Sequence, residues 1–112
     1  MKTRDVVAWT LPLLALVSCG DLEAFRSATG ADTGAAYREY LESYPQGKHV
    51  DAAYARVEAI DYDRAVGENT IEALDRYLEE YPNGRHAREA AGRRRRLHEE
   101  AAEGLQARGG RP

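Results

Sequence analysis

Apolar residues recur at intervals of three and four along most of the chain, the spacing that places them on one face of a helix. The strand signature, an alternation of apolar and polar residues with a period of two, does not occur in the sequence. The pattern predicts helices over about residues 22–29, 33–44, 48–66, 70–81 and 85–107. An all-α fold is therefore expected.

Two Pro-x-Gly segments divide this pattern. Pro45 and Pro82 each follow a helical stretch, and Gly47 and Gly84 come two residues later. Proline disfavours the helical conformation in the residue before it and has no amide proton to donate. Each segment is therefore predicted to end one helix and to form a tight turn to the next.

Other residues indicate where the remaining helices begin and end. Gly30 and Gly67 are expected to end the first and third helices in the left-handed conformation that glycine adopts readily. The side chains of Asp32-Thr33 are expected to cap the second helix. Asn69, followed three residues later by Glu72, has the spacing of a capping box for the fourth helix.

The chain repeats itself at an offset of 37 residues. Laying residues 24–60 over residues 61–97 requires no gap and gives identities throughout. The identical pairs are Ala28/Ala65, Gly30/Gly67, Thr33/Thr70, Ala36/Ala73, Tyr40/Tyr77, Leu41/Leu78, Glu42/Glu79, Tyr44/Tyr81, Pro45/Pro82, Gly47/Gly84, His49/His86, Ala53/Ala90 and Arg56/Arg93. A period of this length is typical of stacked helical hairpins, in which each unit buries its apolar face against the next.

The most regular part of the repeat is a short motif that spans each Pro-x-Gly turn. Its members are Tyr40, Leu41, Tyr44, Pro45, Gly47 and His49, and then Tyr77, Leu78, Tyr81, Pro82, Gly84 and His86. This YLxxYPxG pattern resembles that of tetratricopeptide-like repeats in bacterial envelope lipoproteins. It is similar to repeats of the outer-membrane β-barrel assembly lipoprotein and of the Tol–Pal coordinator.

The resemblance implies a short right-handed α-solenoid of two tetratricopeptide-like hairpins, over residues 24–60 and 61–97, with flanking helices. Residues 98–107 are then the end of a terminal capping helix, and residues 108–112 a disordered tail. The apolar stripe of this last helix is thin, with Ala87, Ala91 and Arg94 along it, and it contains Gly92. A cap without an apolar outer side explains this, and a helix that faces a partner is the alternative.

The first 18 residues read as a lipoprotein signal peptide. Lys2 and Arg4 precede about a dozen mostly apolar residues, which suits a signal sequence and is shorter than the roughly 20 that a spanning helix needs. Leu16-Val17-Ser18-Cys19 resembles the bacterial lipobox, with cleavage between Ser18 and Cys19. Lipidation of Cys19 is predicted, followed by a short tether over residues 19–23. A secretory signal with an incidental cysteine is the alternative.

This reading places the chain in the bacterial cell envelope. Acyl chains on Cys19 would attach the protein permanently to a membrane that it does not span. Aspartate directly after the lipidated cysteine resembles an inner-membrane retention signal, whereas here Gly20 intervenes before Asp21. The outer membrane, facing the periplasm, is therefore expected, with the inner membrane as the alternative.

Charge and side-chain chemistry narrow the function. The chain has 16 Lys and Arg residues against 19 Asp and Glu residues, a net charge of −3, which provides no general attraction to nucleic acid. No phosphate loop, nucleophile elbow or dinucleotide fingerprint occurs, so neither an enzyme nor a cofactor is predicted. His49 and His86 are equivalent, but two imidazoles alone do not complete a zinc site. We expect each histidine to start a helix and to pack on the preceding tyrosine.

A protein-binding scaffold in the envelope is the predicted function, with a partner that the sequence does not name. Candidate contacts are exposed tyrosine hydroxyls and the acidic side chains of Glu39, Glu42, Glu72, Glu79 and Glu80. The basic run that contains Arg93, Arg95 and Arg96 is either a solvated helix face or a contact for anionic lipid or an acidic partner. The alternatives are a structural subunit that self-associates and a lipoprotein associated with peptidoglycan or polysaccharide.

Overall fold

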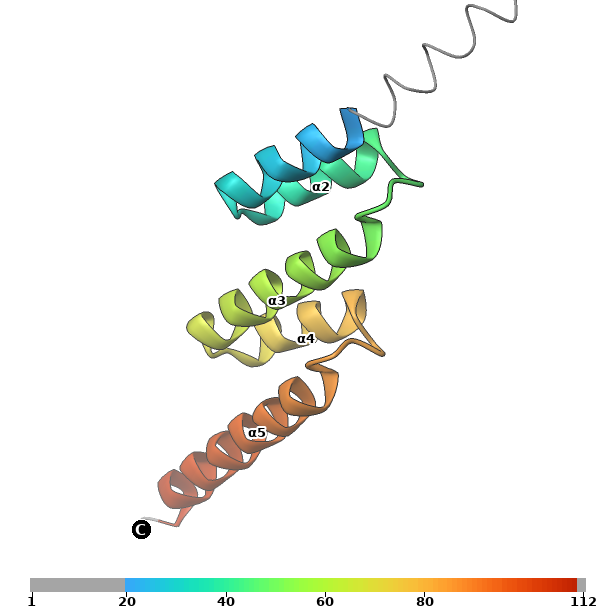
Figure 1. Cartoon of the computed structure of the whole chain (residues 1–112). Coiled ribbons are helices and arrows are strands. Elements are labelled where there is room, and N and C mark those ends of the chain that lie inside the picture. Colours follow the sequence, from blue (N-terminus) through green and yellow to red (C-terminus); the bar gives the residue numbers. More distant parts are fainter. Residues whose placement is uncertain (1–19, 111–112) are drawn as a thin grey trace, which may run out of the picture. The chain divides into compact units, whose positions relative to one another are not determined.

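The computed structural model describes residues 20–110, and within that range it contains helices and turns and no strand. Residues 20–31 form the first helix, followed by α2 (Gly34–Ser43), α3 (Val50–Glu68), α4 (Ile71–Glu80) and α5 (Ala87–Gly109) (Figure 1). The predicted all-α fold is confirmed. The signal peptide, with Ser18 and Cys19, lies outside the described residues. None of the helices of residues 20–110 combines the length and apolar character required to cross a bilayer.

The chain divides into two compact units. The first unit ends at Val57 and the second begins at Glu58, three residues before the boundary that the alignment of residues 24–60 with 61–97 suggests. Helix α3 continues through this boundary without a break. The first unit therefore contains a helical hairpin and the start of α3, and the second contains the rest of α3, α4 and the whole of α5.

In the first unit, the helix of residues 20–31 pairs with α2 (Figure 1). Its core contains Ala28, Tyr37 and Tyr40 from this hairpin and Ala53 and Val57 from α3, all almost fully buried. The ring of Phe25 lies edge-on to Tyr40, with their centroids 5.5 Å apart. The predicted apolar stripe of α2 is thus a stripe of aromatic rings.

In the second unit, α4 packs against both α3 and α5. The core cluster takes side chains from all three helices, namely Tyr62, Ala65, Ala73, Leu74, Tyr77 and Ala90. Leu74 is the one large side chain of residues 20–110 that is completely buried. Small alanines surround it, so the helices approach closely and depend on a few large side chains to fill the space.

Threonine begins the second helix of each hairpin. The hydroxyl of Thr33 accepts a hydrogen bond from the N–H of Ala36 at 3.2 Å, and that of Thr70 accepts one from the N–H of Ala73 at 3.1 Å. Thr33 lies within the predicted capping pair. The prediction that Asn69 caps α4 is wrong, because Thr70 occupies that position.

Asn69 and its equivalent, Asp32, instead end the preceding helices. Both have left-handed backbones, with φ of 51° and 49°. Their N–H groups donate to the carbonyls of Ala65 and Ala28, which closes the last helical turn. Gly30 and Gly67 lie inside helices and do not have positive φ, so their predicted role is wrong. Asn and Asp tolerate the left-handed region better than other side chains that carry a Cβ, so they compete with glycine for this position.

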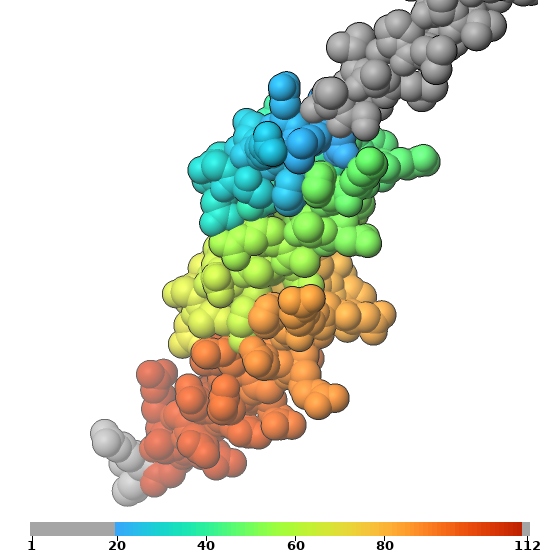
Figure 2. Space-filling view, viewed as in Figure 1, coloured from blue at the N-terminus to red at the C-terminus, as the bar shows by residue number. Residues whose placement is uncertain are grey.

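Proline ends α2 and α4 as predicted. Helix α2 stops at Ser43 and α4 at Glu80, one residue before the tyrosine that precedes each proline. Helix α5 continues to Gly109, so residues 108 and 109 are helical although the predicted tail began at residue 108. The side chains of residues 98–110, coloured red in Figure 2, are exposed to solvent, and Leu105 is 69% exposed.

Candidate functional site

A buried carboxylate joins the helices of the first unit. The hydroxyl of Tyr40, on α2, donates a hydrogen bond to Asp21, on the helix of residues 20–31. The backbone N–H of Lys48 donates to the other carboxylate oxygen of Asp21 at 2.9 Å. The N–H of His49 donates to the Tyr40 hydroxyl at 3.2 Å. One carboxylate therefore fixes α2 and the turn before α3 to the first helix.

The second unit contains a corresponding arrangement 37 residues later, in which the histidine N–H donates to the carboxylate, whereas in the first unit it donates to the tyrosine hydroxyl. The hydroxyl of Tyr77 donates to Glu58 at 2.8 Å, and the N–H of His86 donates to the same oxygen at 3.1 Å. We call this arrangement the carboxylate–tyrosine contact. Asp21 and Glu58 were not identified from the sequence. The aligned window began at residue 24, and extending it by three residues would have paired the two acids.

The two histidines complete the arrangement by stacking. The ring of His49 lies 4.4 Å from that of Phe25, and the ring of His86 lies 4.5 Å from that of Tyr62, each pair almost parallel. Each histidine directly precedes a helix, as predicted, but its stacking partner is an aromatic residue of the unit's first helix. Residues 20–110 contain no cluster of three or more side chains that could hold a metal ion.

Hydrogen bonding keeps these carboxylates ionised. At Asp21, the bonds from Tyr40 and from the N–H of Lys48 lower the pKa. At Glu58, burial opposes ionisation, but the bonds from Tyr77 and the N–H of His86 outweigh it and the pKa is lowered. Burial and the neighbouring carboxylate raise the pKa of Tyr77. Each contact thus pairs an anion with a neutral phenol donor.

Five tyrosine hydroxyls are engaged within the chain. Besides Tyr40 and Tyr77, Tyr37 donates to Asp32 at 2.9 Å, Tyr62 to Glu89 at 3.0 Å and Tyr81 to Asp61 at 2.7 Å. Exposed tyrosine hydroxyls were predicted as partner contacts. These five hydroxyls bond within the chain, as expected where a carboxylate acceptor lies close to a buried hydroxyl, and contact of exposed hydroxyls with a partner stays a prediction.

A second feature of each unit is a groove between its two hairpin helices. The first groove holds a volume of about 330 Å³ and is lined by Ala24, Ser27, Ala28, Ala31, Ala36, Glu39, Tyr40 and Ser43. The second groove holds about 100 Å³ and is lined by Asp61, Arg64, Ala65, Glu68, Ala73, Arg76, Tyr77 and Glu80. Every residue of the second list stands 37 positions after its counterpart in the first. The two grooves are therefore the same place in the repeat.

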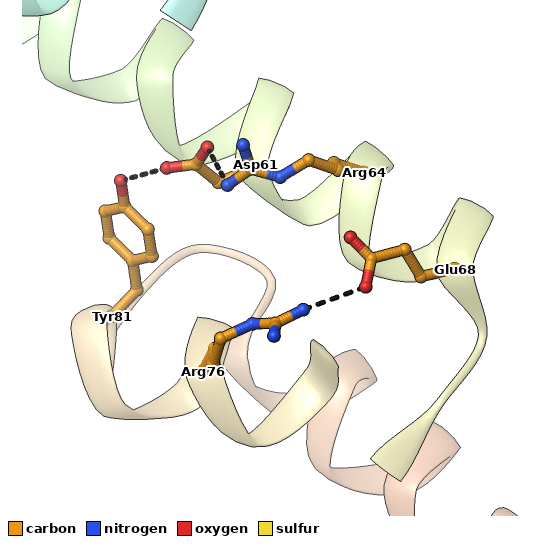
Figure 3. A network of polar contacts seen from close by, with 5 residues as sticks. All are labelled: Asp61, Arg64, Glu68, Arg76 and Tyr81. Carbon is orange, nitrogen blue, oxygen red and sulfur yellow. Dashed lines mark hydrogen bonds and ion pairs between the residues drawn. The ribbon is translucent and has the colours of Figure 1, made fainter. Parts of the chain in front are cut away.

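Charged side chains cross the second groove (Figure 3). Asp61 is 3% exposed and accepts a hydrogen bond from the hydroxyl of Tyr81. It also forms an ion pair with Arg64, at 2.9 Å. A second ion pair joins Arg76 of α4 to Glu68 of α3 at 2.8 Å. These charges satisfy one another, so a ligand would have to displace an existing ion pair.

The first groove has nothing equivalent to these ion pairs. The positions of Asp61, Arg64 and Glu68 are taken by Ala24, Ser27 and Ala31. Among its lining residues, Glu39 is the one with a charged side chain, and it is exposed. An apolar or small polar group of a partner could enter this groove without displacing a charge pair.

The other proposed contact residues are scattered over the surface. Glu42, Glu72 and Glu79 are exposed and line neither groove, whereas Glu80 lines the second groove. Arg95 and Arg96 are exposed on α5, and Arg95 lies 3.9 Å from Glu99. Arg93 is partly buried, and its proximity opposes the rise that burial and Glu89 cause in the pKa of Tyr62. The structure thus does not gather the proposed acidic contacts into one site.

The pH dependence of stability should depend on an ion pair in the first unit. Arg56 donates two hydrogen bonds of 2.8 and 2.7 Å to Asp32. The pKa of Asp32 is lowered from 3.8 to about 2, mostly by Arg56 and to a smaller extent by Tyr37. This stabilisation is complete above pH 3.8 and is lost as the pH falls toward 2. Asp32→Asn should therefore narrow the difference in melting temperature between pH 5 and pH 2.5, measured by circular dichroism.

The substitution is conservative, since Asn69 occupies the equivalent position of the second unit with the same backbone conformation. Arg56→Gln, which removes the cation, should narrow the difference as well. A wild-type pH dependence in both variants would contradict the assignment of Asp32.

Searches against family models, curated proteins and solved structures find no match for this chain.

Proposed function

We propose that this chain is a membrane-anchored scaffold of two tetratricopeptide-like repeats, arranged as a short right-handed α-solenoid, that binds another protein in the bacterial cell envelope. One observation carries the proposal. The contacts that hold each unit together recur at an offset of 37 residues, whereas the residues that line the grooves differ in size and charge. A constant framework with a variable surface is the arrangement expected of a binding scaffold.

The first groove is the proposed binding site. Alanine and serine make up most of its lining, so a helix or extended segment of a partner can approach the backbone closely. The ion pairs of the second groove oppose such an approach, because their separation would leave the buried carboxylate of Asp61 with fewer partners. The partner is therefore proposed to enter the first unit.

Photo-crosslinking in intact cells tests this site. A photoreactive residue at Ser27, which lines the groove, should give an adduct with an envelope protein, identified by mass spectrometry. The same residue at Arg26, an exposed neighbour that does not line the groove, is the control. Equal adducts from both positions would contradict the proposed site, and an adduct of the chain with itself would favour the self-associating subunit.

A matched variant can close the groove without altering the framework. Ala31→Glu with Glu39→Arg transfers the Glu68–Arg76 ion pair to the equivalent positions of the first unit. Both residues are exposed, so the melting temperature should change little. Loss of the Ser27 adduct in this variant is the expected result. An undiminished adduct would place the partner elsewhere.

The anchor is tested separately. The proposed location rests on the lipobox, in which Cys19 supplies the sulfur that is acylated. Cys19→Ala should abolish incorporation of labelled palmitate and should leave an uncleaved precursor, seen on a gel. Normal maturation and normal membrane fractionation of this variant would contradict lipidation, whatever the result of crosslinking.

A further inference from the structure

Helix α5 repeats the position of α3 in the array, but the chemistry of one face is reversed. On α3, Glu58 accepts a hydrogen bond of 2.8 Å from the hydroxyl of Tyr77. Asp61, on the same helix, accepts one of 2.7 Å from the hydroxyl of Tyr81, and both tyrosines belong to α4. The residues 37 positions later, on α5, are Arg95 and His98. Two hydrogen-bond acceptors of α3 are thus replaced by two hydrogen-bond donors on α5.

No helix among residues 20–110 covers this face of α5. Arg95 and His98 are exposed, and so is Ala102, the counterpart of the buried Ala65. A hollow of about 600 Å³ runs along the face and is lined by Arg88, Ala91, Gly92, Arg94, Arg95 and His98. Nothing lies within 4 Å of the place where a Cβ on Gly92 would be. The backbone of another helix could therefore approach α5 closely at Gly92.

The charges of this face have few partners within the described chain. Arg94 forms an ion pair with Asp75 of α4 at 2.7 Å, so its charge already has a partner within the second unit. Arg95 lies 3.9 Å from Glu99, and both side chains are mostly exposed, so this pair contributes little. No ion pair to Arg88 occurs within residues 20–110. The hollow thus presents basic side chains around small residues.

We propose that this face of α5 binds an acidic helix of another protein. On α4, the two tyrosines that meet α3 are four residues apart, which is about one helical turn. A helix in the equivalent position on α5 would meet Arg95 and His98 through residues with the same spacing. Carboxylates at those two positions would oppose the charge of Arg95 and could accept hydrogen bonds from both side chains at that spacing. This surface is separate from the first groove, and the proposal does not depend on the function proposed there.

A designed peptide provides the probe. Its sequence is that of residues 69–83, with Tyr77 and Tyr81 both replaced by glutamate, and it is held helical by a hydrocarbon staple on the opposite face. Fluorescence anisotropy with the full chain should show saturable binding that weakens as salt is raised. A peptide with the two native tyrosines, and one with lysines in their place, should bind at least about tenfold more weakly.

Charge-reversal variants connect this binding to the face. Arg95→Glu with His98→Glu should weaken binding of the glutamate peptide about tenfold or more and should restore binding of the lysine peptide. Arg96→Glu, at an exposed neighbour that does not line the hollow, should change the affinity less than threefold. Equal binding of the three peptides, or an unchanged affinity in the double variant, would overturn the proposal.

Two further measurements examine other occupants. If vesicles of phosphatidylglycerol bind the chain through Arg95 and His98 while the glutamate peptide does not bind, the face belongs to a membrane and the proposal is wrong. If sedimentation shows a dimer that the double variant abolishes, and the peptide does not compete with it, the occupant is a second copy and the proposal is again wrong.

Discussion

Replacement of Leu74 by alanine is expected to lower the free energy of unfolding by about 2–5 kcal/mol. Leu74 has no exposed surface and lies in the cluster that joins α3, α4 and α5. Its neighbours include several alanines, which have no side-chain freedom with which to fill a cavity. The loss of stability should therefore combine two costs. The hydrophobic burial of the removed atoms is lost, and the cavity that they leave stays unfilled.

Urea unfolding followed by circular dichroism measures this loss. Leu105→Ala is the matched control, because the same side chain is 69% exposed on α5, and its cost should stay within about 0.5 kcal/mol. Similar costs for the two variants would mean that Leu74 is not packed as described. A large loss from Leu105 alone would show that its exposed surface is covered in solution.

Replacement of Gly84 by alanine is expected to destabilise the second unit by about 1–3 kcal/mol. A Cβ at this position would lie 2.5 Å from a carboxylate oxygen of Glu58 and 2.9 Å from the Cβ of Tyr81. The carboxylate is held by Tyr77 and by the N–H of His86, and a Cβ atom cannot rotate away. The substitution should therefore push apart the turn and the carboxylate–tyrosine contact. Thermal and urea unfolding measure the change.

Gly67→Ala is the control, with the opposite expected sign. Gly67 lies inside α3, and nothing occupies the space within 4 Å of an added Cβ. Alanine there should raise the free energy of unfolding by about 0.5–1 kcal/mol, because it restricts the unfolded chain and favours helix. Destabilisation by both substitutions, or by neither, would contradict the distinction between turn and helical glycines.

The helices were predictable because their signals are local. The three-and-four spacing of apolar residues, the two prolines and the threonine at position 33 each act within one helical turn. The helix ends at Gly30 and Gly67 were predicted wrongly for a related reason. Glycine and Asn or Asp compete for the left-handed position that ends a helix. The position is set by the residue whose N–H closes the last helical turn, and here that residue is Asp32 or Asn69.

The polar interior could be predicted only in part. The repeat identified the tyrosines and histidines, since identical residues stand out at a fixed offset. Glu58 and Asp61 were not identified, because a carboxylate on a helix is usually solvated, and the sequence does not show which hydroxyl it will meet. The grooves were not predictable at all. Their lining residues differ between units, and the side chains come from two helices whose packing had to be known first.

Each carboxylate that anchors a hairpin finds all of its described donors on its own side of the boundary between Val57 and Glu58. An internal duplication or excision of 37 residues would thus create or remove a complete set of partners together. A deletion of any other length that separated the acid from its tyrosine would leave a buried anion without its donor. Such a gene could therefore lengthen or shorten by whole repeats of 37 residues and still encode a folded product.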